Sequence, residues 1–340
     1  MDKQQTVSLI IIAFNEENYL KPVLDNVLEQ DYPLNKIELI LVDSASEDRT
    51  KELMEAFADK HTNTFLDVKV LDNPQRILPA GWNVALPECT GDIITRWDAH
   101  AEFASDFISS VVAVLGEGED VCGGPRPTKV ADESNLQELL LLVEESAFGA
   151  SFAKYRGEGT TDSYVDAVFH GSYRREVFDK VGLFDERLVR TEDNDIFYRI
   201  RQAGYRIKFD PRINSTQIIR PTVKGMIKQK FANGFWIGKT LFIQPGAVGK
   251  HHLVPLVFVS ALGATSLLAL RGIRTPLKLL SGSYVVADLA MTLAALGSRD
   301  KKEKQNPYLI LLPLAFPTIH VAYGIGTVKG IIQGLVAKTK

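Results

Sequence analysis

The chain has 340 residues, more than one hydrophobic core usually serves, so two structural units are expected. Its net charge of -3 gives no general attraction to nucleic acid, and no nucleic-acid partner is expected. Its two cysteines, Cys89 and Cys122, form neither a CxxC pair nor a zinc-like spacing. This excludes a disulfide scaffold and fits a reducing compartment.

The segment Met1–Thr6 is short and polar, so it lacks the apolar core of a secretory signal peptide, and we expect the N-terminal unit to stay in the cytoplasm. From there to about residue 250, apolar runs alternate with amphipathic helical patterns. The alternation predicts an α/β fold, a mostly parallel sheet with helices on both faces. Strands are predicted at Val7–Phe14, Ile37–Val42, Val68–Leu71 and Ile93–Trp97.

The first predicted strand ends in Ala13-Phe14-Asn15-Glu16-Glu17, with Asn15 as a possible cap of the next helix. In open parallel sheets, ligands bind beyond the carboxyl ends of the strands, so this is a candidate binding segment. A simpler interpretation also holds, because acidic residues in a first helical turn complement the helix dipole.

The second predicted strand ends at Asp43, which emerges from an apolar run into a small polar turn. Its carboxylate can accept a hydrogen bond from a nucleotide base or a ribose hydroxyl. The alternative is an ordinary turn aspartate that caps the loop through its own backbone.

The fourth predicted strand ends in Asp98-Ala99-His100, so that two potential ligands of one cation lie two residues apart. A divalent ion held by few protein groups keeps coordination positions for substrate phosphates, as is usual at nucleotide sites. An imidazole ligand favours manganese over magnesium. The alternative for His100 is a hydrogen-bonded loop histidine.

A further polar cluster, Thr191-Glu192-Asp193-Asn194-Asp195, opens a predicted helix that ends near Gly204. Capping explains Thr191 and one acid, but three carboxylates within four residues repel one another. A crowded carboxylate has a raised pKa, which suits a general base.

The segment 222–242 mixes four lysines, at 224, 228, 230 and 239, with apolar and aromatic residues. The mixture is compatible with a helix at a membrane interface or with an ordinary helix that packs its apolar face on the domain.

Beyond residue 250, apolar segments at 253–270, 277–297 and 307–327 have 18, 21 and 21 residues, within the range of roughly 17 to 25 that can span a membrane. Lys278 and Asp288 lie in the middle segment, where a charge in hydrocarbon is costly. We therefore predict an N-terminal unit of residues 1–245 and a membrane-associated helical region at 246–340 with two or three hydrophobic segments. A soluble helical domain is the alternative.

Taken together, these clusters resemble the inverting family 2 glycosyltransferases of the GT-A fold, over roughly residues 6–240. The resemblance rests on residues 8–17, the stretch around Asp43, Asp98-Ala99-His100 and Glu192-Asp193, in that order. Within the family, the chain is similar to bacterial succinoglycan-type polysaccharide glucosyltransferases through residues 97–101, residues 170–175 and the apolar C-terminal part.

The resemblance implies a nucleotide-sugar donor, UDP-glucose, and a lipid-linked saccharide acceptor at the cytoplasmic face of the cell membrane. It implies a uridine site and a divalent metal, Mn2+ or Mg2+, on the diphosphate. The residues that it assigns to the nucleotide-sugar are Ala13, Phe14, Glu16, Asp43, Arg76, Asp98 and Gly81, the last in a helix start at Gly81-Trp82-Asn83.

For the chemistry, the resemblance implies that Asp98 meets the metal with His100 beside it. Asp193 is the base that deprotonates the acceptor hydroxyl, and Glu192 binds the acceptor or supports that base. The usual motif has an acid where His100 stands, and the Gln-x-x-Arg-Trp motif of processive synthases is missing, which favours one sugar per encounter.

Two rival functions are a nucleotidyltransferase on a related sheet and a non-catalytic nucleotide-binding membrane scaffold. The first strand lacks the glycine-rich basic loop that nucleotidyl transfer expects. The sequence alone leaves open the donor sugar, the acceptor and linkage, the metal, the number of membrane crossings and the oligomeric state.

Overall fold

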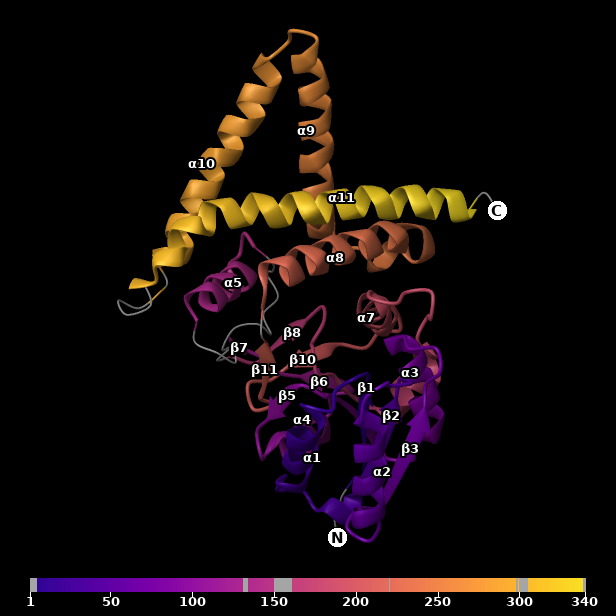
Figure 1. Ribbon diagram of the computed structural model, residues 1–340. Helices are drawn as coiled ribbons and strands as arrows, with labels where there is room; N and C mark the ends of the chain where they lie inside the picture. Colours follow the sequence, from indigo (N-terminus) through magenta and orange to yellow (C-terminus); the bar gives the residue numbers. More distant parts are fainter. Residues whose placement is uncertain are drawn as a thin grey trace. The chain divides into compact units, whose positions relative to one another are not determined.

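The computed structural model describes residues 5–130, 134–149, 161–219, 221–297, 299 and 305–338. The chain divides into two compact units (Figure 1). The first unit combines the residues up to 129 with 154–218, and the second combines 130–153 with the residues from 219 onward. These units differ from the predicted division at residues 245 and 246, because the second unit begins at Ile219 and also includes a segment from the middle of the chain.

The first unit is built on a sheet with the strand order β3-β2-β1-β4-β9-β6-β10-β8. In the part of the sheet that is described, β9 and β8 run antiparallel to their neighbours, and the other pairs are parallel. A separate small sheet has the order β5-β11-β7. The strands are β1 (Val7–Ala13), β2 (Ile37–Asp43), β3 (Asp67–Asp72), β4 (Ile93–Asp98), β5 (Ala101–Phe103), β6 (Val121–Gly123), β7 (Thr128–Val130), β8 (Ser163–Val165), β9 (Ser172–Arg174), β10 (Ile207–Phe209) and β11 (Ser215–Ile219).

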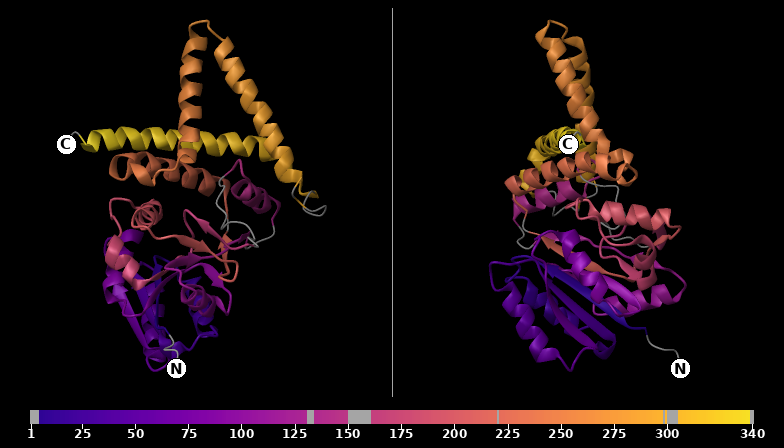
Figure 2. Two further views of the ribbon diagram at one scale, coloured as in Figure 1. Left: turned by 180° about the vertical axis from the view of Figure 1, so that it is seen from behind. Right: turned by 90° about the vertical axis from the view of Figure 1, so that its right-hand side faces the viewer.

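The helices of this unit pack on both faces of the large sheet (Figure 2), because its central strands are buried on both sides and are apolar along their whole length. In β1, Leu9 and Ile11 face one core, and Ile10 faces the other. The helices are α1 (Leu20–Leu28), α2 (Thr50–His61), α3 (Leu78–Ala85), α4 (Phe107–Gly116), α6 (Arg175–Val181) and α7 (Glu192–Gln202).

The four predicted strands and their parallel pairing are confirmed, each to within one residue at either end. Two local predictions are wrong. Asn15 is not a helix cap, since α1 begins only at Leu20 after Tyr19. Gly81 is not at a helix start, because α3 begins at Leu78.

The second unit is helical and consists of α5 (Asn135–Glu145), α8 (Val223–Ile243), α9 (Val254–Leu270), α10 (Thr275–Gly297) and α11 (Leu312–Lys338). Among the described residues, three helical stretches are long and apolar enough to cross a membrane: Lys250–Leu270, Thr275–Gly297 and Pro307–Ala337. They match the three predicted apolar segments, so the chain associates with membranes through this unit.

Helix α8 packs on α11, and its lysines have different environments. Lys224 and Lys228 are exposed, whereas Lys230 is buried and pairs with Glu144 of α5, with Nζ and Oε1 2.9 Å apart. The Lys239 ammonium lies 4.2 Å from the centre of the Trp236 ring. Lys230 therefore belongs to the packing between α8 and α5, whereas Lys224 and Lys228 are solvated.

Candidate active site

The loops that follow β1, β2 and β3 are bound together by polar contacts at the carboxyl edge of the sheet. Each loop contains a non-glycine residue with left-handed backbone: Asn15 (φ 55°), Ala45 (φ 56°) and Arg76 (φ 59°). Asn15 joins two of the loops, because its N–H donates to Ser46 Oγ at 3.0 Å and its Oδ1 accepts from the Glu47 N–H at 2.8 Å. Such backbone strain gathers at functional sites.

Asp43 ends β2 with its side chain turned into its own loop. The residue is only 2% exposed, and both carboxylate oxygens accept from the Ser46 N–H, at 3.3 and 3.2 Å. The turn-capping interpretation of Asp43 is thus confirmed. Contact between Asp43 and a nucleotide stays a prediction.

Phe14 and Arg76 lie side by side at the same edge. The Phe14 ring is exposed, and the Arg76 guanidinium carbon lies 5.6 Å from its centre. Arg76 also pairs with Glu47 at 2.8 Å. Gly81 is buried within α3, where an added Cβ would lie 2.9 Å from Ile12 of β1, so this glycine permits close packing of helix and strand.

Asp98, the last residue of β4, is held by a cation and an imidazole. The Arg96 Nε donates to Oδ1 at 2.9 Å, and His170 Nε2 lies 3.5 Å from Oδ2. Burial opposes ionisation of this carboxyl, but Arg96 and then His170 outweigh it and keep the pKa of Asp98 well below its usual range. Asp98 is therefore an anion at neutral pH.

His170 is placed by the antiparallel pairing of β4 with β9. The register pairs Thr95 with Ser172, and the Arg96 N–H donates to the Gly171 carbonyl at 3.3 Å, which brings His170 next to the end of β4. Burial lowers the pKa of His170 to about 4, so the ring is neutral. Because an ionised Asp98 only accepts, Nε2 carries the proton, and Nδ1 accepts from Ser215 Oγ at 2.7 Å.

His100 lies beside Asp98 and faces the β1 loop. Its Nδ1 is 3.4 Å from Glu16 Oε1, and this contact raises the pKa of His100, although burial opposes the rise. Glu16 and His100 come from different predicted clusters, and the fold brings them together. The side chain of His100 is 39% exposed, so a ligand can reach the ring.

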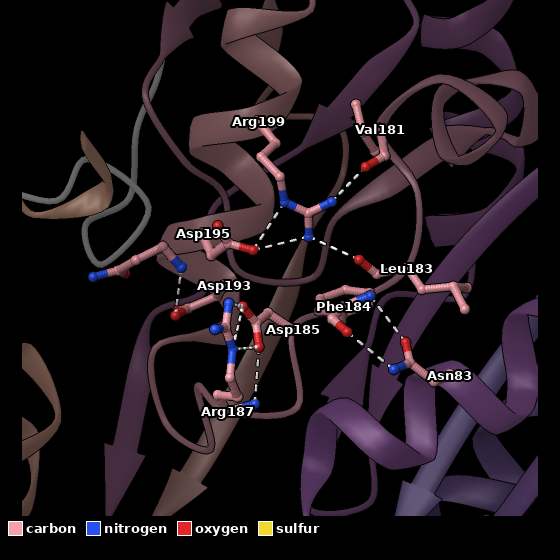
Figure 3. Close-up of polar contacts among 10 residues, drawn as sticks. Asn83, Val181, Leu183, Phe184, Asp185, Arg187, Asp193, Asp195 and Arg199 are labelled. Carbon is pink, nitrogen blue, oxygen red and sulfur yellow. Dashed lines mark hydrogen bonds and ion pairs between the residues drawn. The ribbon is translucent and has the colours of Figure 1, made fainter. Parts of the chain in front are cut away.

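The three acids at the start of α7 have different roles. Asp195 is 2% exposed and accepts from Arg199 Nε at 2.9 Å (Figure 3). The same guanidinium donates to the carbonyls of Val181 and Leu183, so this ion pair fixes the start of α7 to the preceding loop. Asp195 is therefore structural.

Glu192, which is buried, and Asp193, which is half-buried, form a pair of neighbouring acids, here called the acid pair. Burial raises the pKa of Glu192 to about 8, and the neighbouring Asp193 adds to the rise. Burial also raises the pKa of Asp193, against the Asn194 N–H, which donates to its Oδ1 at 2.8 Å, and against Arg96. The predicted direction is confirmed, but burial and not crowding is the larger cause.

Arg96 links Asp98 at the end of β4 with the acid pair at the start of α7. Besides its bond to Asp98, it interacts electrostatically with both members of the acid pair. The sequence analysis missed Arg96, although a charged residue inside the apolar strand Ile93–Asp98 is a signal. It also gave His170 no role.

Arg126 is a second buried cation of this region that sequence reasoning missed. Its guanidinium carbon lies 3.5 Å from the centre of the Phe169 ring, and Nη1 donates to the side chain of Gln217. Its positive charge acts to lower the pKa of His170 and of His100, because it repels the protonated rings. No local pattern marks Arg126, because only the fold brings it to Phe169.

The donors around Asp98 fit a divalent cation. Each carboxylate oxygen of Asp98 contacts one nitrogen and keeps a further lone pair for a metal. Because Glu16 contacts Nδ1 of His100, Nε2 is the ring nitrogen that can bind the same metal. Within the described residues, no group of three or more His, Cys, Asp or Glu side chains is arranged around one metal position. A site with two protein ligands keeps positions for a diphosphate.

The mostly parallel sheet, with an ionised aspartate at the end of β4 and an acid pair at the start of α7, defines a glycosyltransferase of the GT-A fold. The model of the family "Glycosyl transferase family 2" matches residues 8–182, about half of the chain, and the chain belongs to this family. It is a glycosyltransferase of polysaccharide or glycan biosynthesis.

Two relatives match along almost the whole chain. One is the dolichyl N-acetyl-alpha-D-glucosaminyl phosphate 3-beta-D-2,3-diacetamido-2,3-dideoxy-beta-D-glucuronosyltransferase of Methanococcus voltae, 25% identical over 96% of this chain and 98% of the relative. The other is the succinoglycan biosynthesis protein ExoA of Rhizobium meliloti, 27% identical over 94% of both chains. The predicted similarity to succinoglycan-type proteins is thus confirmed.

Among solved structures, the mannosyltransferase PcManGT of Pyrobaculum calidifontis, in complex with GDP-Man and Mn2+, superposes with a TM-score of 0.58. It is 18% identical, and the match covers 99% of this chain and 89% of that one. The similarity shows that the fold is shared.

Proposed function

We propose that the protein transfers glucose from UDP-glucose to a hydroxyl of a lipid-linked saccharide, with inversion at the anomeric carbon. The observation that carries this proposal is Arg96, which lies between an ionised Asp98 and the protonatable acid pair. The name of the Methanococcus voltae relative supports a lipid-linked acceptor, since it contains a dolichyl phosphate sugar. The Rhizobium meliloti relative is a succinoglycan biosynthesis protein, which supports a role in polysaccharide synthesis.

In this mechanism Asp193 accepts the proton of the acceptor hydroxyl as that oxygen attacks the anomeric carbon from the side opposite the diphosphate. Glu192 holds the acceptor or shares the proton with Asp193, because two carboxylates side by side favour one proton between them. Burial raises the pKa of Asp193 above its usual value, which makes this carboxylate a stronger base for the acceptor proton.

Asp98 and His100 would hold a divalent cation, Mn2+ or Mg2+, which supplies positive charge to the leaving diphosphate. Manganese suits the imidazole ligand. Arg96 and His170 fix the Asp98 carboxylate from two sides and so limit its rotation. Arg126, although buried, adds positive charge to this region, which favours an anionic diphosphate near His100.

The nucleotide would bind at the edge formed by the β1, β2 and β3 loops. There the exposed Phe14 ring offers a stacking surface, and the segment from Ala13 to Glu16 offers backbone groups. Asp43 and Arg76 complete the proposed uridine site, and Gly81 supports it by packing α3 against β1. We place this unit on the cytoplasmic side of the cell membrane, where nucleotide-sugars are made.

The first experiment incubates membranes that contain the protein with labelled UDP-glucose and manganese and counts the label in the lipid extract. The proposal expects incorporation by the wild type and a loss of at least a hundredfold in Asp193→Asn, with UDP binding unchanged. Asp195→Asn is the matched control on the same helix, and its turnover per folded molecule should stay near that of the wild type.

Each outcome separates the rival ideas. A non-catalytic scaffold predicts no transfer and no effect of Asp193→Asn. Equal labelling by the wild type and Asp193→Asn would remove Asp193 from the mechanism. Transfer from another nucleotide-sugar but not from UDP-glucose would leave Asp193 as the base and would show that the proposed donor is wrong.

A further inference from the structure

The membrane-associated unit contains a helical hairpin and a helix that lies across it. α9 and α10 form the hairpin, and α11 runs across its base beside α8 in both views (Figures 1 and 2). Contacts fix this arrangement: the Phe258 and Tyr284 rings stack at 4.5 Å between the two legs, and Tyr284 Oη lies 2.8 Å from His320 Nδ1 of α11.

α11 meets α9 in a backbone crossing. A Cβ added at Gly324 would lie 2.5 Å from the Pro255 carbonyl oxygen and 2.4 Å from Val259 Cγ2. No side chain fits between the two helices at this point. The crossing lies near the start of α9. α11 therefore passes the open end of the hairpin, here called its foot, and not the turn that joins α9 to α10.

Glycines also join α11 to α8. A Cβ added at Gly326 would lie 2.1 Å from the Phe231 carbonyl oxygen, and one at Gly330 would lie 2.0 Å from that of Phe235. On α8, Gly238 is equally close to the Thr327 carbonyl oxygen, at 2.4 Å. Small residues at four-residue spacing allow this backbone contact. Because Gly326 meets Phe231 and Gly330 meets Phe235, the two helices run side by side in the same direction.

The opposite face of α11 is apolar and exposed. Leu314, Ile325 and Ile332 are 66%, 48% and 56% exposed, and their spacings of 11 and 7 residues place them on one face. Gly330 is two residues from Ile332 and five from Ile325, so it lies about 140–160° around the helix from this stripe. α11 therefore has a packed glycine face and a bare apolar face.

The hairpin itself is suited to hydrocarbon. Its legs, Lys250–Leu270 and Thr275–Gly297, have 21 and 23 residues, about 31 and 34 Å at about 1.5 Å per residue. The two charges that argued against the second leg do not face lipid at mid-depth. Asp288 is only 6% exposed, and Lys278 lies in the first turn of α10 next to the hairpin turn.

We propose that the α9–α10 hairpin inserts into the bilayer, whereas α11 lies in the plane of the membrane surface with its apolar stripe in the lipid. A helix that crosses the foot of a membrane-inserted hairpin and is bound along its length to the lysine-bearing α8 cannot be a third crossing. The partner of the stripe is the same lipid that surrounds the hairpin.

One consequence is that the end of α11 stays on the same side of the membrane as the catalytic unit. The distribution of basic residues agrees with a cytoplasmic side. In the sequence, Lys250 precedes α9 and four Lys and Arg residues lie at 299–304, after α10, against Arg271 and Arg274 at the hairpin turn.

The first test maps the topology of the full-length protein with a reporter at either end and needs no sugar transfer. Reporters at the N-terminus and after Lys340 should both be accessible from the same side of sealed vesicles. Opposite sides would overturn the proposal and establish three crossings. An inactive protein with both ends on one side would keep this proposal while the proposed function fails.

The second test measures depth in the bilayer. Leu314→Cys, Ile325→Cys and Ile332→Cys are labelled with bimane and quenched by lipids that carry a spin label at different depths. The in-plane helix predicts one shallow depth for all three. A crossing helix predicts that Ile325→Cys is deeper than the other two by several ångströms, which would refute the proposal.

A matched control lies on the hairpin. Val257→Cys and Leu267→Cys replace exposed residues of α9 that are ten positions, about 15 Å, apart along the helix. They should differ clearly in depth. The native thiols do not interfere, because Cys89 and Cys122 are buried.

Discussion

The acid pair predicts that the catalytic unit loses stability as the pH rises, and Glu192→Gln should remove this dependence. The pKa of Glu192 is raised from 4.5 to about 8, chiefly by burial. Between these values the folded protein keeps a proton that the unfolded chain releases. The stabilisation is fully present below about pH 4.5, falls as the pH rises and is lost above about pH 8.

The size of the effect follows from the shift. About 3.5 pH units at about 1.4 kcal/mol each give at most about 5 kcal/mol, and sharing of the proton with Asp193 makes the observed change smaller. Glutamine keeps the shape without the charge. Glu192→Gln should therefore match the wild type near pH 5 and be more stable by several kcal/mol near pH 8.5.

The assay is urea unfolding in detergent at several pH values, followed by tryptophan fluorescence. A Trp236→Phe background leaves Trp82 and Trp97, which are buried in the first unit, so the signal reports that unit alone. Glu52→Gln, at an exposed helical pair, is the control and should keep the wild-type slope. Parallel stability curves for the wild type and Glu192→Gln would refute the reasoning.

Three further predictions concern single contacts. His170→Asn should weaken manganese binding about tenfold by loosening Asp98, as titration calorimetry would show, and unchanged affinity would contradict a positioning role. Asp195→Asn should cost about 3–5 kcal/mol in urea unfolding because it leaves Arg199 partly buried without its anion, while the KM for the donor stays the same. Gly81→Val should cost about 1–3 kcal/mol by overpacking α3 against β1, and a wild-type urea midpoint would contradict that close packing.

The sequence by itself determined the features that depend on neighbouring residues. The strands that end at Ala13, Asp43 and Asp98 were predicted because a strand buried on both faces must be apolar along its length. The acids at 192 and 193 were found because like charges at a helix start are costly. The apolar segments beyond residue 250 were found by length alone.

The tertiary structure decided which of these residues meet. His170 reaches Asp98 only because β9 returns antiparallel to β4 about 75 residues later in the chain, and the fold also brings the acid pair of α7 within electrostatic reach of Arg96. Burial, and not the local sequence, sets the raised pKa of Glu192. Likewise, α11 has the length and hydropathy of a membrane span, and our proposal that it lies in the membrane plane rests on its glycine contacts with α8 and its crossing of α9. Hydropathy measures how apolar a helix is, whereas its orientation in a bilayer depends on what it packs against.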